Sequence, residues 1–163
     1  MLLRIVLNAN FIFIQGVNMK RNVDYSKSIS DDWSTPLLLY EWFMNHGFLD
    51  PCPLNHTING LNIDYYGQKL FINPPFSKLS IWCDYAIKQY KNGCDVILLM
   101  PARTDTLYFH KLLQYCPNIH FFKGRLKFGG CSSPAPFPTI LVTLSKYSMD
   151  NYTHSDLYEY VCG

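Results

Sequence analysis

The chain has 163 residues, the length of one domain, and 48% of them are hydrophobic, enough for one substantial core. Charged residues make up only 16%, which argues against a largely disordered chain. The formal net charge of +2 permits a nucleic-acid partner but is far below that of a polybasic protein. The six scattered cysteines form no C-x-x-C pair, so we expect no metal site and no disulfide framework, but reduced thiols in the cytoplasm.

The two ends of the chain differ in composition from its middle. Residues 1–18 are apolar but interrupted by amide side chains, so they are too short to span a membrane and lack a signal-peptide cleavage pattern. Met19 precedes a basic pair, and we expect it to be the true start, with the leading segment before it as an upstream extension; the alternative for that segment is an added edge strand. Residues 1–30 are then the N-terminal extension of the predicted domain. Residues 31–146 are predicted to form the single domain and residues 147–163 a tail.

The first predicted element is a helix within residues 34–47. Ser34 or Thr35 can cap it, Pro36 suits its first turn, and Gly47 suits its end. The spacing i, i+3, i+4, i+7 predicts one buried stripe of Leu39, Trp42, Phe43 and His46.

Three predicted strands follow, at residues 47–50, 69–73 and 95–101. The second precedes a predicted helix at 77–93, and the third precedes one at 104–116, with Thr104 or Asp105 as its cap. The residues expected to face inward from these two helices are Leu79, Trp82, Cys83, Ala86, Tyr90, Tyr108, Phe109, Leu112, Leu113 and Cys116. The run at 95–101 is continuously apolar, which is typical of a strand covered on both faces of a parallel sheet.

The last part of the chain predicts one or two short strands within residues 119–130 and a final strand at 138–145. Because strands alternate with helices, we predict an α/β fold, a three-layer sandwich with a mainly parallel sheet. Ligands bind outside the carboxyl ends of such strands. Residues 50–52, 73–76 and 100–103 follow three strand ends, so we expect them to line one crevice.

The stretch Asn73-Pro74-Pro75-Phe76 ends one strand abruptly, because proline cannot pair inside a central strand. The Asn73 side-chain oxygen and the Pro74 carbonyl are then firmly held acceptors, and Phe76 offers a ring on which a flipped base can stack. Two such acceptors suit a planar amine, since they draw its nitrogen toward tetrahedral geometry and stabilise the charge that develops during attack. The stretch resembles the catalytic motif of amino methyltransferases that use S-adenosylmethionine, although alone it could be a tight turn.

The resemblance widens to most of the chain, from about residue 31 to residue 143. The segments "DDWSTPLLLYEW", "GFLDPCPLN", "NPPF", "PARTDT" and "GRLKF" with "APFP" occur in the order that is similar to the phage-type, or Dam-like, DNA N6-adenine methyltransferase family. The resemblance implies a single S-adenosylmethionine-dependent domain that methylates adenine in DNA, often encoded by phages and prophages. It implies DNA as the partner, the cytoplasm of a bacterial or virus-infected cell, and neither a metal nor a membrane.

The resemblance also implies roles for individual residues. Catalysis falls to Asn73, Pro74, Pro75 and Phe76. Cofactor binding falls to Asp32, Trp33, Thr35, Pro36, Asp50 and Cys52. The usual glycine-rich loop after the first strand is missing, and too few residues lie between Asp50 and Asn73 for further βα units, so we expect a reduced Rossmann-like fold with Asp64 as a candidate ribose-binding acid.

Four basic residues are candidates for contacts with DNA phosphates. Arg103 follows a strand end, and Lys78 lies beside the proline motif. Arg125 and Lys127 alternate with apolar residues, which places both charges on one side of a short predicted strand. Ordinary solvated charge is the alternative for each of them.

Two alternatives to adenine methylation in DNA stay open. The same acceptors suit cytosine N4, adenine in RNA or a glutamine amide. The missing glycine-rich loop also fits a catalytically inactive DNA-binding relative. The sequence contains no separate recognition domain and does not indicate a recognition site.

Overall fold

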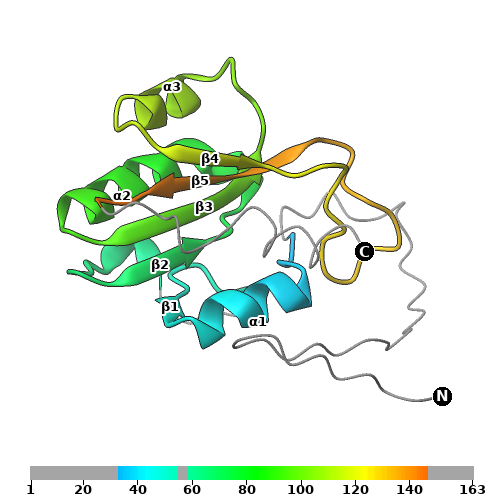
Figure 1. Ribbon diagram of the computed structural model, residues 1–163, viewed down its shortest axis with the longest axis horizontal. Helices are drawn as coiled ribbons and strands as arrows, with labels where there is room; N and C mark the ends of the chain where they lie inside the picture. Colours follow the sequence, from blue (N-terminus) through cyan, green and yellow to red (C-terminus); the bar gives the residue numbers. More distant parts are fainter. Residues whose placement is uncertain (1–32, 55–58, 147–163) are drawn as a thin grey trace.

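The computed structural model describes residues 33–54 and 59–146 (Figure 1). The expectations for residues 1–30, for a start at Met19 and for the tail at 147–163 lie outside the described residues. The described helices are α1 (Leu37–Asn45), α2 (Leu79–Lys91) and α3 (Leu107–Leu113), with 3-10 turns η1 (Gly60–Asn62) and η2 (Phe76–Lys78). The described strands are β1 (Phe48–Leu49), β2 (Lys69–Ile72), β3 (Asp95–Pro101), β4 (Asn118–Phe121) and β5 (Thr139–Leu144).

The strands form one sheet in the order β1-β2-β3-β5-β4. β1, β2 and β3 pair in parallel, whereas β5 is antiparallel to both β3 and β4. The α/β prediction is confirmed, but the prediction of a mainly parallel sheet is confirmed only in part, because the sheet is mixed: the β1–β2 and β2–β3 pairings are parallel, and the two pairings of β5 are antiparallel. The reason lies in residues 122–138, which join β4 to β5 without a helix, so the chain turns at one edge and returns in the opposite direction.

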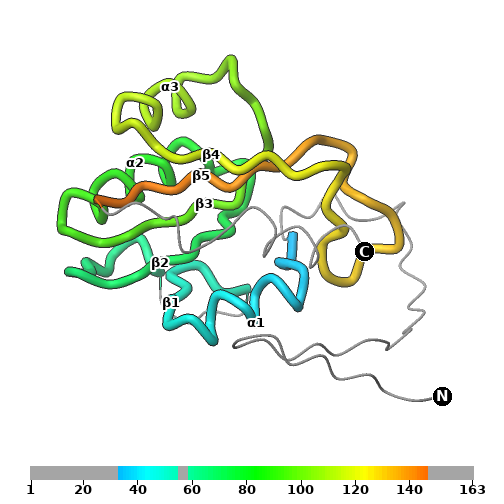
Figure 2. Tube along the Cα trace, viewed as in Figure 1, coloured from blue at the N-terminus to red at the C-terminus, as the bar shows by residue number. Residues whose placement is uncertain are grey.

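Helices cover both faces of this sheet. Successive strand residues point to opposite faces, so Phe71 packs in a cluster with α1 while its neighbours Leu70 and Ile72 pack in a second cluster with α2 and α3. Figure 2 traces the chain from α1, on one side of the sheet, to α2 and α3 on the other. β3 is buried along nearly its whole length, as its apolar run predicts. The two clusters give the fold its three layers.

Helix α1 buries Leu39, Trp42 and Phe43 as the spacing predicts, and His46 is half-buried with its Nδ1 atom 2.7 Å from the Trp42 carbonyl oxygen. The expected cap is wrong. Pro36 occupies the N-cap position, and no side chain caps the helix. A proline has no side-chain acceptor, so the first N–H groups of α1 have no partner from a capping side chain.

Helix α3 is shorter than predicted. The N-cap of α3 is Thr106 rather than Thr104 or Asp105, and no described side chain caps the helix, because the Thr106 hydroxyl donates to the Arg103 carbonyl at 2.8 Å instead. The predicted inward positions Leu113, the last residue of α3, and Cys116, which follows the helix, are both exposed. Only Phe109 and Leu112 are buried on this helix.

Candidate active site

The proline motif lies where β2 ends. Pro74 is buried, and Pro75 has extended backbone (φ −54°, ψ 125°) and starts the turn η2, in which the Lys78 amide donates to the Pro75 carbonyl at 2.9 Å. Helix α2 follows directly and packs on the core. A strand end, two prolines and a packed helix therefore fix the position of Asn73.

The side chain of Asn73 is held at its nitrogen and left open at its oxygen. The Nδ2 group donates to the Trp33 carbonyl oxygen and, at 2.9 Å, to the Thr35 hydroxyl. The Oδ1 atom is buried, and no donor of the described residues reaches it. Buried acceptors are nearly always paired in folded proteins, so this unpaired oxygen is available to an external donor.

Aromatic rings from three separate segments surround Phe76, which is half-buried. Trp33 stacks on it with 6.3 Å between ring centroids and an interplanar angle of 18°. Phe137 and Phe128 meet it edge-on, at 5.4 Å and 5.9 Å. Sequence reasoning missed the two phenylalanines as site residues, although both lie in quoted motifs, "GRLKF" and "APFP". That Phe76 stacks on a base stays a prediction.

A cavity of about 320 Å³ opens beside Asn73, at the carboxyl ends of β1 and β2. It is lined by Ser34, Thr35, Leu37, Tyr40, Asp50, Cys52, Pro53, Leu54 and Asn73. The structure thus brings together the predicted cofactor residues Thr35, Asp50 and Cys52 with the predicted catalytic Asn73. Trp33 and Pro36 lie in the adjoining segment without lining the cavity, and Asp32 lies outside the described residues. The third strand end, at residues 100–103, does not line it either, so one common crevice is formed only in part.

The cavity offers several kinds of contact. The Asp50 carboxylate accepts a hydrogen bond from the Cys52 amide at 2.8 Å, which turns the chain at the end of β1. Burial raises the pKa of Tyr40, and the Asp50 charge adds to this, so the phenol stays protonated as a donor. The first backbone hydrogen bond of α1 runs from the Tyr40 N–H group to the Pro36 carbonyl oxygen. The backbone N–H groups of the helix before Tyr40 are therefore placed to bind an anion.

These groups fit S-adenosylmethionine. A helix N-terminus with a threonine hydroxyl suits the methionine carboxylate, and Asp50 suits ribose hydroxyls or a positive charge. Leu37 and Leu54 provide apolar walls for a nucleobase. The cavity size lies at the lower end of the range for small-molecule sites, about 300–1,000 Å³.

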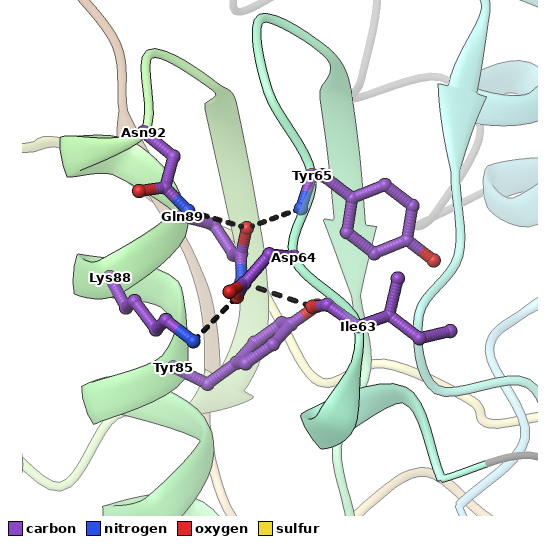
Figure 3. Close-up of polar contacts among 7 residues, drawn as sticks. All are labelled: Ile63, Asp64, Tyr65, Tyr85, Lys88, Gln89 and Asn92. Atoms are coloured by element: carbon purple, nitrogen blue, oxygen red, sulfur yellow. Dashed lines mark hydrogen bonds and ion pairs between the residues drawn. The ribbon is translucent and has the colours of Figure 1, made fainter.

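Asp64 does not belong to this cavity. Its carboxylate forms an ion pair with Lys88 and accepts a hydrogen bond from Gln89 Nε2 at 3.2 Å, both on α2 (Figure 3). These hydrogen bonds, from Lys88 first and Gln89 second, lower the pKa of Asp64. The candidate ribose-binding acid is therefore engaged elsewhere.

The four basic residues predicted to contact DNA, Lys78, Arg103, Arg125 and Lys127, are all exposed. Residues 125–128 alternate as predicted, with the intervening Leu126 and Phe128 buried, but they form no regular strand. The Ala102 amide donates to the Pro138 carbonyl at 2.9 Å. This hydrogen bond connects the segment before Arg103 to the loop that carries Arg125 and Lys127. Phosphate binding by these residues stays a prediction.

Three further features concern only the described part of the chain. No helix there is long and apolar enough to cross a membrane. No group of three or more potential metal ligands occurs within residues 33–54 and 59–146. The five cysteines in these ranges, at positions 52, 83, 94, 116 and 131, form no disulfide with one another.

Comparison with known proteins gives one match. The model of the family described as "DNA N-6-adenine-methyltransferase (Dam)" matches residues 22–140, most of the chain. No curated protein and no solved structure matches. The matched residues contain the proline motif, the lined cavity and the aromatic segments described above. The chain therefore belongs to the Dam family and is a DNA adenine methyltransferase of that family.

Proposed function

We propose that the protein transfers a methyl group from S-adenosylmethionine to N6 of adenine in DNA, with the base flipped out of the duplex to the Asn73–Phe76 motif. The observation that carries this proposal is the buried, unpaired Oδ1 atom of Asn73 beside the cavity. A reduced Rossmann-like fold, with the cofactor at the ends of β1 and β2, agrees with this assignment. The phage origin that the resemblance implies stays a prediction.

Asn73 and Pro74 act on the target amine. When bound, S-adenosylmethionine supplies an electrophilic methyl group on a positively charged sulfur. Asn73 Oδ1 and the Pro74 carbonyl each accept one N–H of adenine N6, which localises the nitrogen lone pair and stabilises the positive charge that develops. Both acceptors are neutral, so the surplus proton of the methylated nitrogen leaves to water. The buried Asn73 nitrogen bonds keep Oδ1 in place throughout.

Phe76 receives the flipped base on its ring. Trp33, Phe128 and Phe137 cover that ring in the free protein, so the base displaces at least one of them. Trp33 is the ring that stacks on Phe76, and a base that replaces it keeps a similar contact. Lys78, Arg103, Arg125 and Lys127 contact the phosphates around the site.

Methyl transfer to unmodified DNA tests the proposal directly. We expect the wild-type protein to transfer tritiated methyl groups, and nucleoside mass spectrometry to identify N6-methyladenine. Asn73→Ala should lower kcat by about 10²–10³-fold, the usual cost of removing one preorganised hydrogen-bonding group. Phe76→Ala should lower it as well, whereas Asn45→Ala, an exposed amide at the end of α1, should match the wild type. Robust activity in both Asn73→Ala and Phe76→Ala would overturn the mechanism.

The same assay separates the rival functions. If the methylated product is cytosine, adenine in RNA or a glutamine amide, the methyl-transfer mechanism stands, but the group that receives the methyl is not adenine in DNA. Absence of S-adenosylmethionine binding in calorimetry, with and without DNA, would identify an inactive DNA-binding relative.

A further inference from the structure

Thr35 lies between the two halves of the proposed site. It lines the cavity, and its hydroxyl oxygen accepts a hydrogen bond from Asn73 Nδ2 at 2.9 Å. The two residues are 38 positions apart in the sequence. One side chain therefore contacts both the space for the cofactor and the residue that faces the target amine.

The ordinary role of a threonine just before a helix is to cap it, and Thr35 does not do so. Pro36 is the N-cap of α1, and no side-chain cap bond is present. Thr35 is half-buried at this position, with its oxygen turned to Asn73 instead. The first turn of α1 thus loses a capping bond typically worth about 1 kcal/mol, which indicates that the hydroxyl serves another purpose.

The Thr35 hydroxyl can accept one hydrogen bond and donate another at the same time. A hydroxyl has one proton and two acceptor positions. Because Thr35 accepts from Asn73, its own proton must go to a different acceptor, and within the described residues it donates to none. The proton is available to an acceptor in the cavity, where an anionic group forms the stronger bond.

The Asn73 amide is sensitive to this hydroxyl. Its nitrogen donates two hydrogen bonds, to the Trp33 carbonyl oxygen and to the Thr35 hydroxyl. Rotating the amide by half a turn would place Oδ1 against the Trp33 carbonyl oxygen, which can only accept, whereas the Thr35 hydroxyl could still donate to it. Once an acceptor in the cavity takes the Thr35 proton, the hydroxyl can only accept from Asn73, and both bonds then favour the orientation in which Oδ1 remains open.

We propose that Thr35 is a positioning residue that couples the cofactor cavity to the catalytic amide. A carboxylate that accepts the Thr35 proton fixes the hydroxyl, the hydroxyl fixes the Asn73 amide, and the amide presents Oδ1 to the target amine. This inference rests on the proposed function, which supplies the methionine carboxylate as the acceptor. Coupling of this kind is reciprocal, so cofactor binding and capture of the amine strengthen one another.

A double-mutant cycle measured by calorimetry tests the coupling without turnover. The proteins are the wild type, Thr35→Val, which keeps the shape and removes the hydroxyl, Asn73→Ala, and the double variant, each titrated with S-adenosylmethionine. We expect Thr35→Val to weaken binding about tenfold in the wild-type background, since it removes a hydrogen bond to a charged group. In the Asn73→Ala background, Thr35→Val should lower the affinity for S-adenosylmethionine by at most about threefold, because the hydroxyl is no longer hydrogen-bonded to the Asn73 amide. A ratio of the two losses of three or more supports the coupling, and a smaller ratio overturns it.

Kinetics distinguish positioning from simple cofactor binding. At saturating cofactor, Thr35→Val should still lower kcat about tenfold or more, because Asn73 is no longer oriented. Thr35→Ser, which keeps the hydroxyl, should restore most of kcat and affinity. A kcat of Thr35→Val equal to that of Thr35→Ser would overturn the positioning role. Urea denaturation of each variant verifies that it is folded.

Failure of the inference and failure of the proposed function give different results. Cofactor binding with coupling but no methylated DNA overturns the proposed function alone. If DNA is methylated but Thr35→Val lowers the affinity for S-adenosylmethionine equally in the wild-type and Asn73→Ala backgrounds, the inference alone is overturned. Absence of cofactor binding in the wild type overturns both.

Discussion

Two side-chain amides hold distant segments of this protein together, Gln89 on α2 and Asn73 at the end of β2. Gln89 is fully buried and uses both ends of its amide: its oxygen accepts from the Tyr65 amide at 2.8 Å, and its nitrogen donates to the Ile63 carbonyl at 3.3 Å and to Asp64 (Figure 3). Asn73 uses its nitrogen in the same way but leaves its buried oxygen unpaired among the described residues.

The difference between the two amides separates a structural role from a functional one. A satisfied buried amide fixes a loop, here residues 59–68 against α2, and any missing bond costs stability. An amide with one unpaired acceptor destabilises the free protein, and a ligand that donates a hydrogen bond to that acceptor removes the destabilisation. We therefore expect changes at Gln89 to affect stability and changes around Asn73 to affect binding and turnover.

Gln89→Leu should give the largest loss of stability. Leucine fills a similar volume but leaves the Tyr65 amide without its acceptor, so the free energy of unfolding should fall by about 2 kcal/mol. Urea denaturation measures this value. The control Asn92→Ala removes only a 3.4 Å bond at the edge of the same network and should cost less than about 1 kcal/mol. Equal stability of Gln89→Leu and wild type would remove the distinction between the two amides.

Gly129→Ala should disturb the site more than the fold. A Cβ atom there would lie 3.0 Å from Ser34 Oγ and 3.3 Å from the Thr35 carbonyl oxygen, so it pushes on the segment that holds Asn73. We expect cofactor affinity to fall roughly five- to tenfold, a loss of about 1 kcal/mol or slightly more.

The neighbouring glycine provides the matched control. Gly130 has a φ of +80° and open space around its Cβ position, so Gly130→Ala adds backbone strain of about 1 kcal/mol without touching Ser34. It should lower stability and preserve cofactor affinity in calorimetry. An equal loss of affinity in both variants would mean that strain in the loop, rather than contact with the 33–35 segment, is responsible.

Arg125→Ala and Lys127→Ala should weaken DNA binding by a few-fold each. If each side chain contacts one phosphate, its removal should reduce the slope of log affinity against log salt by about one. Lys91→Ala is the control, because Lys91 ends α2, whose 13 residues place it roughly 20 Å from the proline motif. Fluorescence anisotropy of labelled DNA over a salt series measures the slopes, and an unchanged slope in both variants would contradict phosphate contacts at this loop.

Asp64→Asn should have the smallest effect, and that effect should depend on pH. The pKa of Asp64 is lowered in the folded protein by hydrogen bonds from Lys88 and then Gln89, so its charged form contributes stability at neutral pH. That contribution is lost as the pH falls through the folded pKa, below the ordinary value of about 3.9. The urea midpoint of Asp64→Asn should thus be slightly below the wild type at neutral pH and equal to it in strong acid. The same difference at both pH values would exclude the ion pair as its source.

Much of the fold could be predicted from local patterns, because helices and strands depend on periodicity and on proline and glycine. The proline pair ends β2 at Ile72 without help from the rest of the molecule. Helix caps could not be predicted, since Thr35 could bond to the α1 amides or to a distant partner, and only folding brings Asn73 within reach. The direction of β5 was missed for a similar reason: the apolar run fits a parallel or an antiparallel neighbour, and the path of residues 122–138 decides.

In the candidate site, too, some features follow from the local sequence and others from long-range contacts. Local sequence is enough to predict that Asn73, Pro74, Pro75 and Phe76 form a stiff set of acceptors and a ring at a strand end, because proline restricts the chain locally. Three features depend on long-range packing: Asn73 keeps its oxygen unpaired among the described residues, Trp33 stacks on Phe76, and Asp64 pairs with residues of α2. These contacts join residues that are far apart in the chain, and their choice among competing partners depends on how the layers pack.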